Sequence, residues 1–208
     1  MDRAGSRPLA LEPQVGADLG GLREWPRDQV VKCLCFCHPD DEAELWRAQG
    51  ETVLRLFHAT RRNNLEFLLE VIPSKCGPVT DDTVAEVIQR FYDLGVCPDW
   101  WKLEPFKTGA AWQNAAGAIE RNDPRTRGIV VLGLDASEDD LAASFALAAA
   151  QPLVKGFAVG RTIFGQPARD WMAGAISDDE AVATMASNFT RLCRIWDKAR
   201  SGAGEEAA

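Results

Sequence analysis

Four ionisable side chains interrupt apolar stretches of the sequence that read as buried strands. Lys32 lies in VVKCLC, Glu70 lies in LLEVIP, and Lys102 and Glu104 lie in WWKLEP. Side chains alternate between the two faces of a strand, so two lysines and two carboxylates meet on neighbouring strands if the polar faces point the same way. They would form either an ion-pair network that fixes strand register or a functional site. The cost of burying charge favours the functional site.

Two lysines beside two carboxylates suit chemistry through a Schiff base. A lysine becomes a nucleophile when burial or a neighbouring cation lowers its pKa. Lys102 meets that description, with Trp100 on its own face and Lys32 close by. Glu70 and Glu104 would then move protons while a carbon–carbon bond is cleaved. Trp100 is either a wall of the substrate site or part of the core.

Three of the six cysteines fall on the first of these strands, at Cys33, Cys35 and Cys37, followed by His38. Thiolates on zinc, with Zn–S distances of about 2.3 Å, lie about 3.8 Å apart. Residues on one face of a strand are about 6.5 Å apart. The spacing therefore indicates small buried side chains and no metal site. Lys32 and His38 lie on the opposite face, which makes His38 a candidate substrate contact.

Short apolar runs alternate with helical patterns along the chain. This alternation is typical of β-α-β units and a parallel sheet. The apolar runs cover 30–37, 66–73, 99–105, 128–136 and 154–164. A last helix is expected from Asp178 to Ala199, after the helix start signal SDDE.

A doubly wound sheet and a (β/α)₈ barrel both fit this α/β alternation. Polar residues inside the strands favour the barrel, which admits them where they converge on a site. Gly156, Ala158 and Gly160, small residues on one face of the last expected strand, also suit a barrel interior. Eight units need about 250 residues, and only about five are found here. We therefore expect a TIM-barrel type fold that is truncated on its N-terminal side.

Barrels often bind phosphate with the loops after their last two strands. Here these loops are 132–137, which contains Asp135, and 158–165, which contains Gly160 and Arg161. Gly160 would let backbone N–H groups approach an anion, and Arg161 adds a planar fork of donors. Asp135 would contact substrate from the end of its strand. The alternative for Arg161 is a surface or interhelix ion pair.

The composition, 46% hydrophobic and 26% charged over 208 residues, is typical of a globular protein. A net charge of −8 disfavours nucleic acid as a partner. The absence of a membrane-spanning run and of a signal-peptide core predicts a cytoplasmic protein with reduced cysteines and no membrane contact. We expect an extended arm or loop over 1–27, a partial barrel over 28–200 and a disordered tail over 201–208.

Five segments together resemble a known family. They are VVKCLCFCHPDD, LLEVIPSK, PDWWKLEP, DPRTRGIVVLGLDA and KGFAVGRTIFGQPARDWMAG. From Arg7 to Arg200 the sequence is similar to the aldolase-like domain at the C-terminus of bifunctional inositol-catabolism proteins. In those proteins a ribokinase-like 5-dehydro-2-deoxygluconokinase domain precedes it. The domain is similar in turn to class I tagatose-1,6-bisphosphate aldolases, which are barrels.

The resemblance implies roles for particular residues. Lys102 takes the place of the Schiff-base lysine, Lys32 and Glu70 match the lysine and glutamate that flank it, and Arg161 lies in the phosphate-side segment. It implies cleavage of 6-phospho-5-dehydro-2-deoxygluconate to dihydroxyacetone phosphate and malonate semialdehyde, without a cofactor. The family's first strands, with an Asp-His-Arg segment, have no counterpart here.

That departure leaves a second hypothesis open. The chain would be a non-catalytic or partner-completed barrel fragment, because an incomplete barrel exposes two sheet edges. Its partner would be a second copy of the chain or a kinase domain. Kinase activity in this chain itself is disfavoured, because a P-loop is absent and a GAGEE sequence that resembles a kinase motif lies in the tail, at 202–206.

Overall fold

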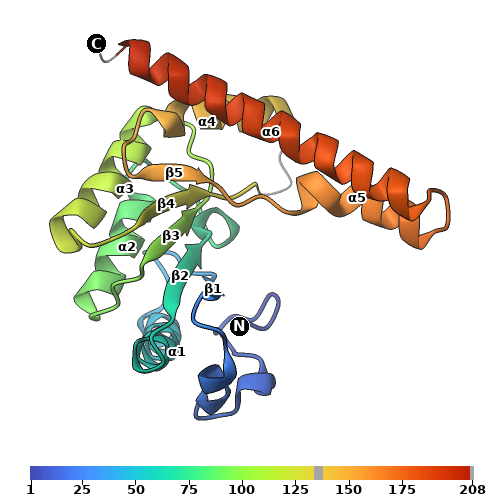
Figure 1. The fold of residues 1–208 in the computed structure, drawn as a ribbon. Helices are drawn as coiled ribbons and strands as arrows, with labels where there is room; N and C mark the ends of the chain where they lie inside the picture. The colour runs from blue at the N-terminus through green and yellow to red at the C-terminus, as the bar shows by residue number, and fades with distance from the viewer. Residues whose placement is uncertain (134–137, 207–208) are drawn as a thin grey trace. The chain divides into compact units, whose positions relative to one another are not determined.

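The computed structural model of the chain describes residues 1–133 and 138–206. Within them, five strands form one sheet in the order β1-β2-β3-β4-β5, and a helix follows each strand (Figure 1). The strands are β1 (Val30–Cys35), β2 (Glu66–Val71), β3 (Trp100–Leu103), β4 (Gly128–Val131) and β5 (Val154–Phe157). The helices are α1 (Ala43–Arg62), α2 (Thr83–Asp93), α3 (Gly109–Asn122), α4 (Glu138–Ala149), α5 (Arg161–Met172) and α6 (Asp178–Glu206). The predicted α/β class, with five β/α units, is confirmed.

Side chains alternate along β1, β2 and β3 between an apolar and a polar face. Cys33 and Cys35 of β1, Leu69 of β2 and Trp101 of β3 have no exposed surface. The positions between them include Lys32 and the other charged residues of these strands. Because strand neighbours share this alternation, one face of the sheet enters the core and the other is left to polar side chains.

Helix α2 packs through a single apolar stripe. Val87, Ile88 and Phe91 are fully buried and recur at the spacing of an α-helix. The Phe91 ring lies 5.2 Å from the ring of Trp46 in α1 and 6.3 Å from that of Trp101 in β3. Burial of each such large side chain stabilises the fold by about 1.5–3 kcal/mol.

Residues 1–27, predicted to be an extended arm or loop, hold two short 3-10 helices. These are η1 (Pro13–Val15) and η2 (Gly20–Glu24). The apolar side chains of this arm are buried at Leu9, Val15, Leu19 and Leu22. The arm is therefore packed onto the domain by its own small set of core residues.

The chain divides into two compact units. The first comprises Met1–Leu103 and Ala110–Ile129, and the second comprises Glu104–Gly109 and Val130–Ala208. Helices α1 and α2 belong to the first unit, and α5 and α6 belong to the second. Each unit has buried apolar residues of its own.

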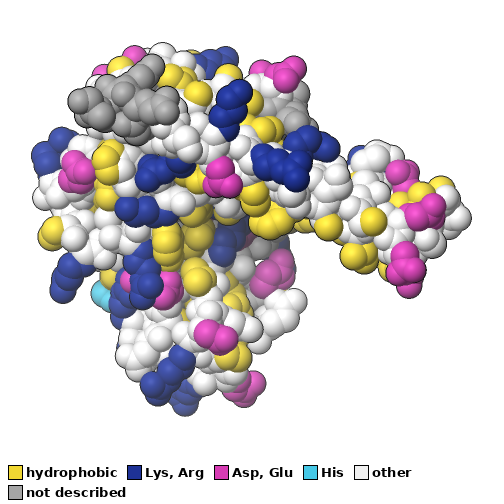
Figure 2. All heavy atoms as spheres, turned by 45° about the horizontal axis from the view of Figure 1, so that its top comes forward, with side chains coloured by type: hydrophobic (Ala, Val, Ile, Leu, Met, Phe, Trp, Pro, Cys, Tyr) yellow, Lys and Arg dark blue, Asp and Glu magenta, His cyan; other side chains and the backbone are white. Residues whose placement is uncertain are grey.

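The second unit has an aromatic core. The Phe145 ring of α4 stacks on Phe157 of β5 at 5.1 Å and meets Trp196 of α6 edge-on at 5.5 Å. Helices α5 and α6 pack against each other as a hairpin. Hydrophobic side chains reach the surface along this hairpin (Figure 2). The large exposed ones are Phe164, Trp171, Met172, Val182 and Phe189.

The strand predicted over 154–164 is shorter than expected. β5 ends at Phe157, and α5 begins at Arg161, so Ala158 and Gly160 do not continue a strand face. Gly160 is the N-cap of α5, and its carbonyl accepts the N–H groups of Ile163 and Phe164 at 2.8 Å and 3.1 Å. Closing this first helical turn ends the extended conformation.

Helix α6 is longer than predicted. It runs for 29 residues to Glu206, across part of the segment predicted to be a disordered tail. Ser177 Oγ accepts the Glu180 N–H at 3.3 Å, and the Glu180 carboxylate accepts the Ser177 N–H at 2.9 Å, which is a capping box. Among the helices in the described part of the chain, none is long and apolar enough to cross a membrane.

Candidate active site

Lys32, Glu70 and Lys102 form a chain of ion pairs on the polar face of the sheet. Glu70 Oε2 lies 2.7 Å from Lys32 Nζ, and Glu70 Oε1 lies 3.3 Å from Lys102 Nζ. The Glu70 side chain is 7% exposed, against 19% for Lys102 and 39% for Lys32. One buried carboxylate therefore joins two more accessible lysines.

The register of the parallel strands brings these side chains together. Glu70 of β2 is the register partner of Leu34 on β1 and of Lys102 on β3. Lys32 lies two residues before Leu34 and so points to the same face. Adjacent strands are about 4.8 Å apart, a gap that a lysine side chain easily spans. The sequence prediction placed these three residues on one face, and the structure places them in contact.

A second carboxylate, Asp2, reaches Lys32 from the N-terminal arm. Asp2 Oδ1 accepts a hydrogen bond from the Leu34 N–H at 2.8 Å and lies 3.5 Å from Lys32 Nζ. The Arg3 N–H donates to the Ala10 carbonyl at 2.8 Å, which folds the start of the arm back on itself. The contact of Asp2 with Lys32 could not be predicted from the sequence, because a contact across 30 residues leaves no periodic signal.

The pKa of Lys32 reflects these neighbours. Burial on its own lowers the pKa of a lysine, because it disfavours the charged form. Hydrogen bonds and charge from Glu70 and Asp2 outweigh burial and raise the pKa of Lys32 above its ordinary value of 10.5. Lys32 is therefore an ammonium at neutral pH and not the free amine that attacks a carbonyl.

Glu104, the other predicted catalytic carboxylate, follows the last residue of β3 directly. It is buried, and it belongs to the second compact unit. Strand alternation predicted that Glu104 shares a face with Lys102, but β3 ends at Leu103, so Glu104 lies beyond the strand. A role for Glu104 in proton transfer stays a prediction.

Trp100 begins β3 on the same face as Lys102. Its Nε1–H donates to Glu66 Oε2 at 2.8 Å, and Glu66 also pairs with Arg127 at 2.8 Å. The polar atom of Trp100 is thus held by the first residue of β2. The ring lies toward the beginning of the strand, two positions before the lysine.

His38 lies three residues after the end of β1 and is buried. Its Nδ1 accepts the Asp40 N–H at 3.2 Å, so Nε2 carries the proton and donates to the Pro78 carbonyl at 2.9 Å. The ring also packs close to Gly77, where an added Cβ would lie 3.1 Å from ring atoms. His38 therefore ties the loop after β1 to the loop after β2 and uses both ring nitrogens to do so.

The predicted phosphate-side residues belong to the second unit. Gly160 caps α5, and Arg161 is the exposed first residue of that helix. Asp135 lies outside the described residues, in the gap at 134–137. A helix N-terminus favours anions, and a phosphate contact at Gly160 and Arg161 stays a prediction.

The three cysteines of the first strand region are all fully buried. Burial is the main cause that raises the pKa of Cys33 and of Cys37, which keeps both as thiols. Among residues 1–133 and 138–206, there is no group of three or more His, Cys, Asp or Glu side chains arranged to hold a metal ion. Cys33 and Cys35 have the role of small apolar side chains in the core.

The geometry of the ion-pair chain separates the two lysines chemically. Lys32 faces two carboxylates, at 2.7 Å and 3.5 Å, and Lys102 contacts the nearer of them, Glu70, at 3.3 Å. Glu70 can accept a proton from either amine. The arrangement therefore offers one fixed cation, one candidate nucleophile and a carboxylate between them.

Known structures share this fold. The chain is similar to a fructose-bisphosphate aldolase from Plasmodium falciparum, crystallised with TRAP and a small-molecule inhibitor, at 16% identity and a TM-score of 0.59. That match covers 85% of this chain and 57% of the aldolase. It is also similar to Cgl0159 from Corynebacterium glutamicum, at 20% identity and a TM-score of 0.51, over 76% of this chain and 50% of the other.

These likenesses show the fold alone, and the chain spans 57% of the length of the aldolase and 50% of the length of Cgl0159. No curated protein matches the sequence. One family model, described as an uncharacterized protein conserved in bacteria (DUF2090), matches residues 1–200. The chain therefore belongs to the DUF2090 family.

Proposed function

We propose that the chain carries the catalytic centre of a class I, Schiff-base aldolase. The observation that supports this most is the buried Glu70 carboxylate, which contacts the amines of both Lys32 and Lys102. A structural ion pair needs one lysine, whereas a Schiff-base aldolase needs a nucleophilic amine, a carboxylate for proton transfer and a retained positive charge. The aldolase-like fold agrees with this assignment.

Lys102 is the proposed nucleophile. Lys32 has two carboxylate neighbours and a raised pKa, so its amine stays protonated. Lys102 has the longer contact with Glu70, and the Lys32 charge lies on the other side of that carboxylate. Transfer of one proton from Lys102 to Glu70 would give the free amine that attack requires.

The proposed reaction begins when Lys102 Nζ attacks the ketone carbon of the substrate. Loss of water then leaves a protonated C=N bond. The Glu70 carboxylate takes the proton of the hydroxyl group on the β carbon. The bond between the α and β carbons breaks, its electron pair moves into the iminium, and an aldehyde leaves.

The remaining enamine is protonated at its α carbon by the same carboxylic acid, which restores the carboxylate. Water then hydrolyses the iminium and frees Lys102. The water lost in the first step is recovered in the last, so the net reaction is one carbon–carbon cleavage. The Lys32 ammonium would stabilise negative charge that develops on oxygen.

For the substrate we propose 6-phospho-5-dehydro-2-deoxygluconate, an intermediate of inositol catabolism, which would give dihydroxyacetone phosphate and malonate semialdehyde. The sequence resemblance to the aldolase-like domain of bifunctional inositol-catabolism proteins supports this choice. By that resemblance, Gly160 and Arg161 stay the candidate phosphate contacts. Asp135, His38 and Trp100 stay candidate substrate contacts.

A coupled assay tests this proposal. Release of dihydroxyacetone phosphate would be followed by its reduction with NADH, for the wild-type chain, Lys102→Met and the control Lys75→Met, which changes an exposed lysine after β2. We expect release from wild type and the control and none from Lys102→Met. Equal release from all three would reject Lys102 as the nucleophile.

A second candidate function is a barrel fragment that another polypeptide completes, either a second copy or a kinase domain. β5 lies at one end of the strand order, and strand edges invite pairing. The exposed apolar side chains of the α5–α6 hairpin also favour a partner. A wild-type chain that melts cooperatively but releases no product would favour this candidate.

A further inference from the structure

The N-terminal arm covers the outer edge of β1 in a specific way. The Leu34 N–H and the Lys32 carbonyl point away from β2, where a neighbouring strand would pair. Asp2 Oδ1 accepts the Leu34 N–H at 2.8 Å, and the Met1 amino group donates to the Lys32 carbonyl at 3.3 Å. Edge groups that would otherwise be free for pairing are thus satisfied by the arm.

Further contacts hold the arm in this place. Arg7 donates from Nε to the Phe36 carbonyl at 3.2 Å and pairs with Asp41, whose other oxygen accepts the His38 N–H. Residues Asp2 and Leu11 form an antiparallel bridge within the arm. These contacts hold the backbone of the arm in place, and the Asp2 side chain is 13% exposed.

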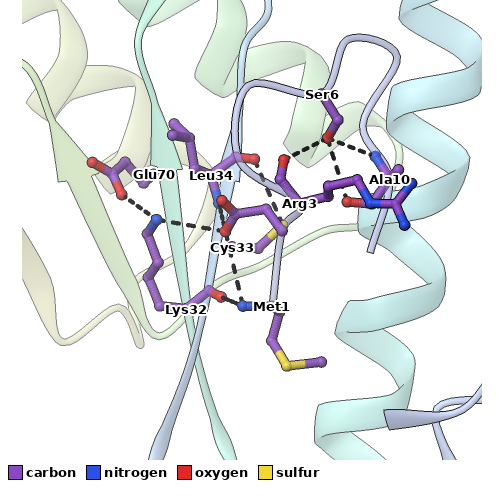
Figure 3. A network of polar contacts seen from close by, with 9 residues as sticks. Met1, Arg3, Ser6, Ala10, Lys32, Cys33, Leu34 and Glu70 are labelled. Atoms are coloured by element: carbon purple, nitrogen blue, oxygen red, sulfur yellow. Dashed lines mark hydrogen bonds and ion pairs between the residues drawn. The ribbon is translucent and has the colours of Figure 1, made fainter. Parts of the chain in front are cut away.

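The same carboxylate oxygen that caps the edge also faces the site. Glu70 Oε2 contacts Lys32 Nζ from β2 at 2.7 Å (Figure 3). Asp2 Oδ1 lies 3.5 Å from the same amine. The other charged groups near Lys32 are the Met1 amino group, 3.9 Å from Asp2 Oδ1, and Lys102 beyond Glu70. Lys32 is thus held between two carboxylates from separate parts of the chain.

We propose that Asp2 is a positioning residue of this site: its carboxylate fixes Lys32 as the permanent cation and leaves Glu70 available to Lys102. This assignment rests on the proposed aldolase function and extends it, because it explains how two neighbouring lysines acquire different roles. Without the Asp2 carboxylate, Glu70 alone would neutralise Lys32. Proton exchange between Glu70 and Lys102 would then be hindered.

The test measures the ionisation of Lys32 directly in the full chain. Trace acetylation at a series of pH values, read by mass spectrometry for each lysine, gives the pH midpoint of each amine, with exposed Lys75 as internal standard. The variants are Asp2→Asn, which keeps an oxygen for the Leu34 N–H, and Asp2→Glu, which keeps the charge. Asp18→Asn removes another arm carboxylate, one that binds the Gly20 N–H.

We expect the pH midpoint of Lys32 to be lower in Asp2→Asn than in wild type. At a fixed pH below both midpoints, the free-amine fraction should rise about tenfold for every pH unit by which the midpoint falls. The midpoint should stay near the wild-type value in Asp2→Glu and Asp18→Asn. A Lys32 midpoint that is the same in Asp2→Asn as in wild type would overturn the proposal. So would an equal fall in Asp2→Glu, which would show that the fit of the arm matters and the charge does not.

This result is independent of catalysis. If Lys32 responds to Asp2→Asn but Lys102→Met leaves product release unchanged, the aldolase mechanism fails and the positioning by Asp2 stands as an electrostatic fact. If Lys102 is the nucleophile but the pH midpoint of Lys32 is unchanged in Asp2→Asn, the aldolase assignment stands and the role of Asp2 is rejected. Where both hold, Asp2→Asn should also move the alkaline limb of the pH–kcat profile to lower pH, as a purely structural role would not.

Discussion

Glu70 and Lys102 lie directly opposite each other in the register of β2 and β3, and their side chains meet at 3.3 Å. The same Glu70 carboxylate holds Lys32 at 2.7 Å from the other neighbouring strand. Three neighbouring strands of the parallel sheet therefore each supply one residue: Lys32 from β1, Glu70 from β2 and Lys102 from β3. The consequences for activity and stability can be measured separately.

The central carboxylate should matter for turnover. Glu70→Gln keeps the size of the side chain but removes its charge and its capacity to accept a proton. We expect product release to fall by about 10²–10⁴-fold. Glu86→Gln, an exposed position on α2, is the matched control and should leave release unchanged. Wild-type rates in Glu70→Gln would exclude proton transfer by this residue.

Lys32 should make stability depend on alkaline pH. The pKa of Lys32 is raised in the folded state, so its contribution is fully present below the unfolded value of 10.5 and is lost as the pH rises through the folded value. Wild type should therefore lose more stability than Lys32→Met above that pH. Urea unfolding of both proteins at matched pH values measures this. Parallel pH profiles would show that the ion pairs contribute nothing to the difference.

The buried cysteines should be unreactive in the native state. Cys33, Cys35 and Cys37 are fully buried, and Cys76, Cys97 and Cys193 are partly exposed. We expect a thiol reagent followed by peptide mapping to label the three partly exposed cysteines first, and the strand cysteines only on unfolding. Rapid native labelling of Cys33 would contradict the packing described for β1.

Cys33 is predicted to act as a small buried side chain and not as a metal ligand. Cys33→Ala removes a small buried side chain and should lower the free energy of unfolding by about 1 kcal/mol.

Chelator treatment of the wild-type chain should leave the melting temperature unchanged. A large drop in melting temperature with chelator would mean that the cysteine cluster binds a metal after all.

Much of the fold and the core of the site could be predicted from residue patterns. Alternation along β1 put Cys33 and Lys32 on opposite faces, and the same rule put Glu70 and Lys102 on the polar face of their strands. These are local signals, because a period of two is fixed by strand geometry itself. The register that turns shared faces into contacts is a property of the sheet, and here the parallel pairing supplied it.

Other features depend on contacts that local patterns do not encode. Asp2 meets Lys32 only because the arm folds back over the edge of β1. The Nε1–H of Trp100 is held by Glu66, 34 residues earlier. The sequence predicted the end of a strand at Arg161, because a short apolar run fits either a strand or a helix. In the structure Gly160 is the N-cap of a helix there.

Borohydride trapping at Lys102 tests the central claim most directly. The full chain would be incubated with dihydroxyacetone phosphate, reduced with borohydride and mapped by mass spectrometry, with Lys102→Met and Lys75→Met as paired controls. We expect a reduced adduct on Lys102 in wild type and in Lys75→Met, and none in Lys102→Met. A cooperatively folded wild-type chain that forms no adduct, or one that forms it equally on Lys75, would contradict a Schiff-base site built on Lys32, Glu70 and Lys102.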